Sequence, residues 1–294
     1  MAINPRLRAA GAARYHTEAR DGIDILGEPS EDRAVEPQIS TMTLLDASFL
    51  VKRAGQGAPI VVVHGGGGSP RFLPALQVLA QRFEVIVPQA PGFGGGQSPP
   101  WLESIGDLAN FYLEFLDALD LRRVHLVGLS LGGWVAAELA MRNAGRLASL
   151  TLMDAPGIFL PGIAQLDPFL LSEEEGVRAL FHDQALANRA MATMLAPETE
   201  DVRLSNQRTV AMLAWQPRFH DPHLQRWLHR IRIPTLIIWG ENDRLFPPAY
   251  GEAWAKAIAG SRLAVVARCG HLPIQEQPET FARLVGEFCG ELSR

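Results

Sequence analysis

The sequence contains few cysteines and has neither a long apolar run nor a cluster of basic residues. Cys269 and Cys289 are the two cysteines among 294 residues, too few for a disulfide framework or a cysteine-based metal site. No apolar segment reaches the roughly 18–20 residues that span a bilayer. No apolar stretch follows the arginines near the N-terminus either, so we expect no secretory signal. These absences predict a cytoplasmic protein with reduced thiols.

The charge balance excludes two classes of partner. The chain has 27 Lys and Arg against 32 Asp and Glu, which gives a formal net charge of −5 at pH 7. Because no basic run is present, we expect neither nucleic acid nor a membrane surface as a partner. With 47% hydrophobic and 20% charged residues, the composition is ordinary for a soluble globular protein. A chain of 294 residues is long enough for one large α/β domain or for a core with an inserted smaller domain. The composition does not indicate an oligomeric state.

Short β-rich runs alternate with helical patterns along most of the chain. Most of these runs are continuously apolar, which is typical of strands covered on both faces. The expected strands are Phe49–Arg53, Ile60–His64, Glu84–Pro88, Val124–Gly128, Ser149–Asp154, Thr235–Gly240 and Ala264–Arg268. The expected helices are Phe72–Gln81, Ser104–Leu119, Leu131–Arg142, Pro248–Ile258 and Pro278–Cys289. The alternation predicts an α/β fold with a mostly parallel, doubly wound sheet flanked by helices.

Two regions interrupt this alternation. Residues 1–40 are polar and contain glycines and prolines, so we expect an N-terminal arm along the domain edge. Residues 156–230 contain no β-rich run, and their helical patterns are Ser172–Phe181, Gln184–Leu195, Ser205–Ala214 and Pro222–Arg230. An insertion of this length exceeds a simple crossover. It predicts a helical cap, or lid, over the C-terminal edge of the sheet, and leaves residues 41–155 and 231–294 for the α/β core.

The most informative motif is Gly-x-Ser-x-Gly at residues 128–132. It lies between an apolar run that ends at Val127 and a helical pattern that begins at Leu131. A sharp strand-to-helix turn strains the backbone of its central residue and leaves no room for neighbouring side chains, which explains the glycines. Such a nucleophile elbow lifts Ser130 above the sheet as a candidate nucleophile. The alternative is a tight glycine-rich turn that carries an unreactive serine.

A serine hydroxyl needs a base, and the base needs an orienting acid. Among eight histidines, His271 follows the last apolar run, so we expect it at the same sheet edge as Ser130. The chain order of serine, acid and histidine also favours His271. The remaining histidines are assigned to strands, to structural positions, to the arm or to the insertion: His16, His64, His125, His182, His220, His223 and His229.

Two aspartates compete for the role of the acid. Asp243 comes directly after the run Thr235–Gly240, where its carboxylate would accept the imidazole Nδ1–H. Asp154 ends an earlier strand at the same edge, and we expect the neighbouring Glu241 to point elsewhere. Either aspartate has capping of a turn as its alternative role. We favour Asp243.

Backbone N–H groups complete the expected constellation. A run of four glycines, residues 65–68, follows a strand, and the amides of Gly66 and Leu131 form a candidate oxyanion hole. A phosphate cradle is the alternative, but no Gly-Lys-Ser/Thr follows and a Gly-x-Gly-x-x-Gly pattern from Gly65 meets Pro70. A second glycine cluster fails in the same way at Gln97. We therefore expect no cofactor and no metal.

Taken together, these motifs resemble those of the α/β-hydrolase family over about residues 42–290. The resemblance is carried by residues 64–65 with the following glycines, and by residues 91–94, 128–133, 240–243 and 270–271. It implies Ser130 as nucleophile, His271 as base and then acid, Asp243 as orienter, and Gly66 and Leu131 as oxyanion donors. One departure is Gln89, where many members carry an aspartate.

Within this family, the serine nucleophile favours hydrolysis of a small carboxylic ester through an acyl-enzyme. The alternative is hydrolysis of a carbon–carbon bond in a vinylogous diketone, such as a meta-cleavage product. Members of that second kind commonly carry asparagine before the serine and tryptophan after the histidine, whereas this chain has Leu129 and Leu272. Perhydrolase activity and a non-catalytic small-molecule-binding protein are further alternatives. Either substrate is a small, largely apolar molecule, which we expect the insertion to help bind.

Overall fold

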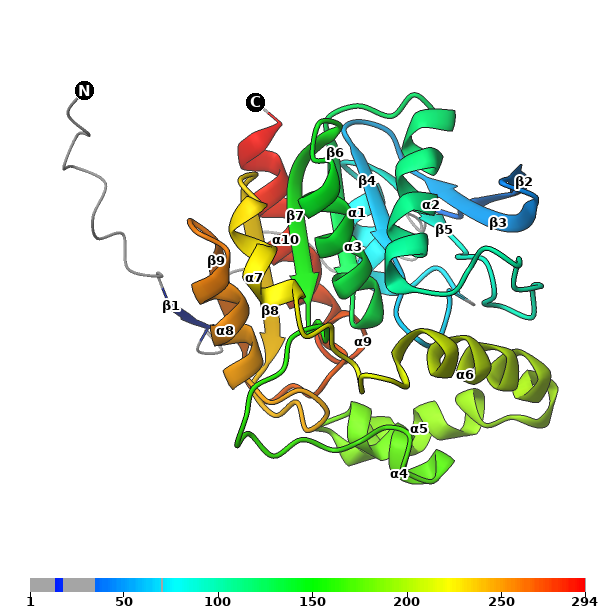
Figure 1. Cartoon of the computed structure of the whole chain (residues 1–294), viewed down its shortest axis with the longest axis vertical. Helices are drawn as coiled ribbons and strands as arrows, with labels where there is room; N and C mark the ends of the chain where they lie inside the picture. The colour runs from blue at the N-terminus through cyan, green and yellow to red at the C-terminus, as the bar shows by residue number, and fades with distance from the viewer. Residues whose placement is uncertain (1–13, 18–34, 70, 294) are drawn as a thin grey trace.

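The computed structural model describes residues 14–17, 35–69 and 71–293 (Figure 1). Within these residues, the strands form one nine-stranded sheet in the order β1-β9-β8-β7-β6-β4-β5-β3-β2. Their bounds are β1 Arg14–Thr17, β2 Gln38–Leu44, β3 Ala47–Ala54, β4 Pro59–Val63, β5 Glu84–Pro88, β6 Val124–Leu129, β7 Leu147–Met153, β8 Thr235–Gly240 and β9 Arg262–Val266. Pairing is parallel from β1 to β5 in this order and antiparallel at β5–β3 and β3–β2. The mostly parallel sheet is confirmed.

Both edges of the sheet differ from the sequence expectation. Strand β1 lies inside the expected arm 1–40 and pairs with β9, while β2 begins at Gln38 and pairs with β3. Strand β9 also begins two residues earlier than Ala264 and ends at Val266 instead of Arg268. Short polar strands at an edge lack the continuous apolar run that marks a central strand, so the sequence pattern missed them. The rest of the arm lies outside the described residues.

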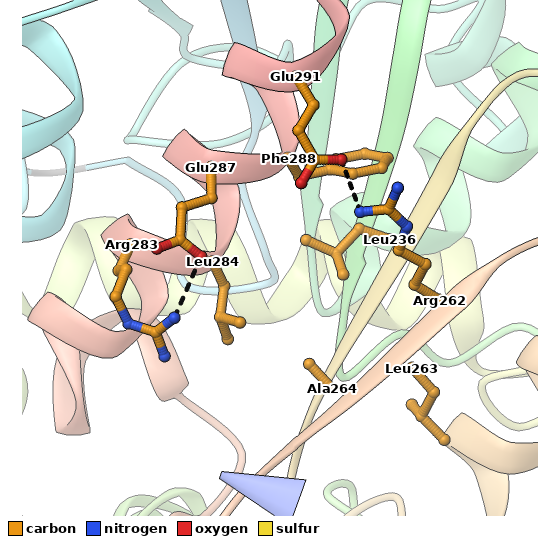
Figure 2. Close-up of a pocket in the computed structure, with 9 residues that line it drawn as sticks. All are labelled: Leu236, Arg262, Leu263, Ala264, Arg283, Leu284, Glu287, Phe288 and Glu291. Carbon is orange, nitrogen blue, oxygen red and sulfur yellow. Dashed lines mark hydrogen bonds and ion pairs between the residues drawn. The ribbon is translucent and has the colours of Figure 1, made fainter. Parts of the chain in front are cut away.

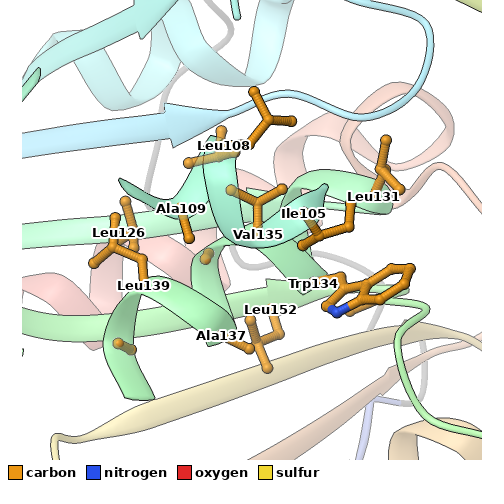
Figure 3. Packing of buried hydrophobic residues seen from close by; sticks show 14 of the residues in the cluster. Ile105, Leu108, Ala109, Leu126, Leu131, Trp134, Val135, Ala137, Leu139 and Leu152 are labelled. Atoms are coloured by element: carbon orange, nitrogen blue, oxygen red, sulfur yellow. The ribbon is translucent and has the colours of Figure 1, made fainter. Parts of the chain in front are cut away.

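Helices cover both faces of the sheet and create two cores. On one face are α2 Ile105–Ala118, α3 Leu131–Arg142 and α8 Ala249–Ala257, and on the other are α1 Pro74–Ala80, α9 Pro273–Glu276 and α10 Pro278–Leu292. Strand residues alternate between these cores: Val61 of β4 faces the first, and Val62 faces the second. Figure 3 shows α2 and α3 packed together over β6 and β7. Burial on both faces explains the continuously apolar strands.

The segment between β7 and β8, residues 154–234, contains helices and none of the named strands. It contains α4 Glu173–Leu180, α5 Gln184–Met194, α6 Glu200–Ala214 and α7 Leu224–Trp227, with single 3₁₀ turns at Pro197–Thr199 and Leu228–Arg230. Ser172 and Asp183 cap α4 and α5 by accepting backbone N–H bonds. In Figure 1, α4, α5 and α6 lie beyond the end of the sheet to which the parallel strands point. None of the helices in the described residues is long and apolar enough to cross a bilayer.

The register of the sheet sets the place of the site. Val63 pairs with Gly128, Leu129 with Met153, and Gly240 with Val266, so β4, β6, β7, β8 and β9 end near one another. The loops that follow these strands therefore emerge at one edge, under the inserted helices. Those loops contain the residues that the sequence singles out.

Candidate active site

Ser130 lies at a strained turn between β6 and α3. Its backbone has φ +50° and ψ −120°, a conformation that a residue with a side chain adopts rarely. The Ser130 N–H donates to the Met153 carbonyl at 2.8 Å, and its carbonyl accepts from Gly133 N–H at 2.7 Å. These bonds hold the backbone of Ser130 in its strained conformation and set the orientation of its side chain. The local geometry is that of the expected elbow.

The glycines around Ser130 permit close backbone contacts. A Cβ on Gly132 would lie 2.2 Å from the Val63 carbonyl oxygen, and one on Gly128 would lie 2.5 Å from the Gly132 oxygen. Side chains at these positions would force the elbow away from the end of β4. The glycines of the motif are therefore explained by sterics, as the sequence predicted.

His271 lies between Ser130 and Asp243. Its Nε2 is 2.7 Å from Ser130 Oγ, and its Nδ1 is 2.8 Å from Asp243 Oδ2. The side chains of His271 and Asp243 are 3% and 0% exposed, so water does not compete for the pair. Because Asp243 accepts at Nδ1, the neutral imidazole carries its proton there and presents Nε2 to the serine hydroxyl.

The Asp243 carboxylate is fixed by its own loop. Its Oδ1 accepts from Leu245 N–H at 2.8 Å and from Phe246 N–H at 3.1 Å, which leaves Oδ2 for His271. Glu241 points elsewhere, as expected: it accepts from Arg268 N–H at 3.1 Å. The capping bonds do not compete with the imidazole contact, so Asp243 caps its own turn and bonds to His271 at the same time.

Asp154 lies beside this pair but makes a different contact. Its Oδ1 accepts from Gly240 N–H at 2.9 Å, and no hydrogen-bond partner of its Oδ2 occurs within the described residues. Burial and the neighbouring Asp243 charge raise the pKa of Asp154 well above its ordinary value. His271 Nδ1 contacts Asp243 and not Asp154, so the geometry favours Asp243 as the partner of the imidazole.

The loop after β4, residues 64–69, packs directly on the elbow. A Cβ on Gly65 would lie 3.2 Å from Ser130 Cβ, and the Gly65 carbonyl accepts from Gly68 N–H at 3.0 Å. Leu131 is the first residue of α3, where backbone N–H groups lack partners within the helix. Within the described residues, no hydrogen bond to the N–H of Gly66 occurs. Both expected oxyanion donors thus belong to segments that meet at Ser130.

His64 supports the same loop in its neutral form. Its Nε2 accepts from Ala90 N–H at 2.9 Å, so the proton is on Nδ1, which donates to the Gly65 carbonyl at 2.8 Å. Burial, with a smaller contribution from the Lys52 ammonium, lowers the pKa of His64 to about 4. The ring therefore stays neutral at the pH of most assays, and its role is structural, as predicted.

Several contacts around the site were not anticipated from the sequence. Asn206 and Thr209 of α6 bond to the glycine loops at residues 67, 92 and 94. Glu276 accepts from the N–H groups of Gly270, His182 and Asp183 and so ties the His271 loop to the inserted helices. These partners lie far apart in the chain, and no local motif marks them.

A groove elsewhere on the surface shares no residue with this site. Figure 2 shows it between α10 and strands β8 and β9. Its charged groups are already paired, Arg262 with Glu291 at 2.8 Å and Arg283 with Glu287 at 3.2 Å. Because these charges are paired with one another, the groove offers less to a charged ligand, and Ser130 is the candidate site that we describe.

Comparison with known proteins decides the family. A model of the Alpha/beta hydrolase family matches residues 60–284. The chain belongs to this family. The match includes β4 from its second residue, the elbow, the Asp243 loop and the His271 loop, so the family resemblance of the sequence motifs is confirmed.

The relatives of the chain include proteins named as hydrolases. It is 31% identical over 270 residues to 2-hydroxy-6-oxononadienedioate/2-hydroxy-6-oxononatrienedioate hydrolase 2 of Pseudomonas putida, covering 83% of this chain and 92% of the relative. It is 29% identical over 255 residues to 2-hydroxy-6-oxo-2,4-heptadienoate hydrolase of Pseudomonas putida, covering 80% and 90%. The crystal structure of a point mutant of the meta-cleavage product hydrolase CumD superposes with a TM-score of 0.70 at 23% identity, covering 88% and 99%. This structural likeness shows the fold alone.

Proposed function

We propose that this chain hydrolyses a bond beside a carbonyl carbon through a covalent acyl intermediate on Ser130. The observation that carries the proposal is the row from Ser130 Oγ through His271 to Asp243, with distances of 2.7 and 2.8 Å. An imidazole held by a carboxylate at Nδ1 is oriented to take the serine proton at Nε2. Burial of the acid keeps its charge close to the imidazolium that forms.

Each step of the reaction uses one part of this geometry. Ser130 Oγ attacks the carbonyl carbon while His271 accepts its proton, and the carbonyl oxygen becomes an oxyanion near the N–H groups of Gly66 and Leu131. One such donor contributes about 3–4 kcal/mol to transition-state stabilisation. His271 then protonates the leaving group, and a water that loses its proton to His271 releases the acid from Ser130.

For the substrate, we propose a vinylogous diketone in which a carbon–carbon bond is cleaved. Two relatives that each cover most of this chain are named as hydrolases of 2-hydroxy-6-oxo dienoates or dienedioates. Attack on the 6-oxo carbon breaks the adjacent carbon–carbon bond, and the electron pair is delocalised into the conjugated oxo acid. His271 would then protonate carbon. These relatives shift our preference away from the ester hydrolase that the sequence favoured.

Ester hydrolysis is the second candidate because of the residues beside the triad. Leu129 precedes the serine and Leu272 follows the histidine, and both pack in or against the hydrophobic core. Neither offers the polar or indole N–H group that diketone-cleaving members commonly have there. An ester has a better leaving group than a carbanion, so it needs less support from such groups.

An aromatic row beside His271 supports a small substrate with a flat, conjugated part. Phe246 lies 5.6 Å from the His271 ring, Phe219 lies 5.8 Å from Phe246, and Phe169 lies 4.9 Å from Phe219, all between ring centroids. Phe169 and Phe219 belong to the inserted segment. We propose that residues 156–230 form a cap that provides this apolar wall.

The two substrate classes are separated by two compounds that deliver the same acetyl group. The first is 2-hydroxy-6-oxo-2,4-heptadienoate and the second is p-nitrophenyl acetate. We expect kcat/KM for the dienoate to exceed that for the ester by about tenfold or more, since the enzyme would recognise the whole substrate. The opposite order would favour the ester hydrolase.

Ser130→Ala tests the mechanism common to both classes. We expect it to lower kcat for either compound by about 10³-fold or more, while Ser40→Ala, at an exposed position of β2, leaves both rates unchanged. Full activity of the Ser130→Ala variant, or no turnover of either compound by the unmodified chain, would refute the proposal.

A further inference from the structure

Asn206 of α6 bridges two loops of the α/β core. Its Oδ1 accepts from Gly94 N–H at 2.8 Å, and its Nδ2 donates to the Gly67 carbonyl at 2.9 Å. Because one partner offers an N–H and the other a carbonyl, the orientation of the amide is fixed. Asn206 is 6% exposed, which is unusual for a polar residue on a helix that lies outside the sheet layers.

The bond to Gly67 continues as a chain of hydrogen bonds toward the oxyanion hole. The Gly67–Gly68 peptide accepts from Asn206 at its carbonyl and donates from Gly68 N–H to the Gly65 carbonyl at 3.0 Å. That carbonyl belongs to the peptide whose other end is the Gly66 N–H. A peptide held at its carbonyl has its N–H direction fixed, and aligned hydrogen bonds polarise one another.

Other residues of α6 also contact the glycine loops of the core. Thr209 is 3% exposed and donates to the Gly92 carbonyl at 2.5 Å. Val210 Cγ2 lies 3.0 Å from the position that a Cβ on Gly66 would take, so α6 packs directly over the oxyanion loop. Glycines at 66 and 67 have no side chains to fix their own conformation, and the loop depends on such external contacts.

We propose that Asn206 is a positioning residue that sets the direction of the Gly66 N–H, so that the oxyanion hole is complete only when α6 is docked. The inference rests on the proposed function, because it assigns the oxyanion role to Gly66. It gives the inserted segment a part in the chemistry as well as in substrate binding. Loss of the contact should therefore weaken the transition state more than the ground state.

Three variants and one control test this inference with p-nitrophenyl acetate. Asn206→Ala removes both bonds, and Asn206→Asp keeps an oxygen for Gly94 N–H but places a second acceptor against the Gly67 carbonyl. Thr209→Val removes the bond from Thr209 to the Gly92 carbonyl and keeps the side-chain shape. Gln207→Ala, at an exposed position of the same helix, is the control.

We expect Asn206→Ala and Asn206→Asp to lower kcat by about 10- to 100-fold with KM changed by less than about threefold, somewhat less than direct loss of an oxyanion donor. The inhibition constant of a boronic acid, whose tetrahedral adduct on Ser130 places an oxygen in the hole, should rise by a similar factor. Thr209→Val should change kcat by less than about threefold, and Gln207→Ala should match the unmodified protein.

The outcomes separate this inference from the proposed function. If Ser130→Ala is inactive but both Asn206 variants keep their kcat, Asn206 does not position the oxyanion hole, whereas the triad mechanism stands. Equal losses in Thr209→Val and Asn206→Ala, or a rise in KM with constant kcat, would mean that α6 contributes only packing, and would overturn the inference. If Ser130→Ala is active, the proposed function itself fails.

Discussion

The carboxyl groups of Asp154 and Asp243 lie beside one another and beside the His271 ring. One oxygen of each and one ring nitrogen all lie within 4.8 Å of one another, and all three residues are buried. Burial and the charge of Asp243 raise the pKa of Asp154. Two buried carboxylates at this distance do not both ionise readily, and the raised pKa favours the protonated form of Asp154.

We expect Asp154→Asn to raise the unfolding free energy relative to the unmodified protein, and to raise it more at neutral pH than at acid pH. The native state holds a proton on Asp154 that the unfolded chain loses above its ordinary pKa of about 3.9. The unfolding free energy contributed by this group therefore falls as pH rises from that value toward the raised pKa, by up to about 1.4 kcal/mol per pH unit. Asparagine removes this dependence and still accepts from Gly240 N–H.

Urea unfolding at pH 4, 5.5 and 7 measures this effect. The difference in unfolding free energy between Asp154→Asn and the unmodified protein should grow in favour of the variant as pH rises. Glu114→Gln, at an exposed position of α2, should show no such trend. A difference that is constant with pH would mean that Asp154 is ionised in the native state.

Asp243→Asn should impair the reaction far more than Asp154→Asn. An asparagine amide donates where the carboxylate accepts, so the imidazole loses the tautomer that presents Nε2 to Ser130 as a base. The expected fall in kcat is about 10³–10⁴-fold, against less than about threefold for Asp154→Asn. Steady-state kinetics on p-nitrophenyl acetate measure both values, and the reverse order would assign the acid role to Asp154.

The sequence predicted the parts of the site that follow directly from the strands. Ser130, Asp243 and His271 each come just after an apolar run, and carboxyl ends of parallel strands meet at one sheet edge. The elbow was also identifiable because its glycines are required by backbone contacts within a few residues. Local patterns and one topological rule were therefore enough to predict these three positions together.

The contacts that hold the oxyanion loop could not be predicted in this way. Asn206 meets Gly94 and Gly67 across 112 and 139 residues of chain, and its place on α6 follows no apolar or glycine pattern. Strand β1 could not be predicted for the same reason, because its pairing with β9 joins segments from opposite ends of the chain. Tertiary packing alone determines these features, and a single sequence does not encode them as a motif.

Gly240→Ala should destabilise the fold at the base of the site. A Cβ there would lie 1.8 Å from the Gly270 carbonyl oxygen. The backbone at Gly240 leads to Asp243, and the backbone at Gly270 leads to His271. We expect a loss of about 3 kcal/mol or more in unfolding free energy. Gly176→Ala, in α4 with no atom within 4 Å of the added Cβ, should instead gain about 0.5–1 kcal/mol. Urea unfolding of both variants checks the pair, and equal effects would contradict the steric argument.

His125 predicts how stability changes on acidification. Ser293 Oγ donates to the Cys289 carbonyl at 2.8 Å, so it accepts from His125 Nε2–H at 3.0 Å, and His125 Nδ1 accepts from Ser149 Oγ at 2.8 Å. Burial lowers the pKa of His125 from 6.5 to about 4. Between pH 6.5 and about 4, His125 binds a proton in the unfolded chain but not in the folded one. The unfolding free energy therefore falls as pH drops through this interval.

We expect His125→Gln to remove most of this contribution, whatever its absolute stability at neutral pH. A shift of this size corresponds to at most about 3 kcal/mol between pH 7 and pH 4. Urea unfolding at pH 7, 5.5 and 4.5 should show a shallower fall for His125→Gln than for the unmodified protein. His229→Gln, at an exposed position, should follow the unmodified protein. Parallel curves for His125→Gln and the unmodified protein would mean that the folded ring accepts a proton as easily as the unfolded one, and that its bonds to the two serines do not fix it as neutral.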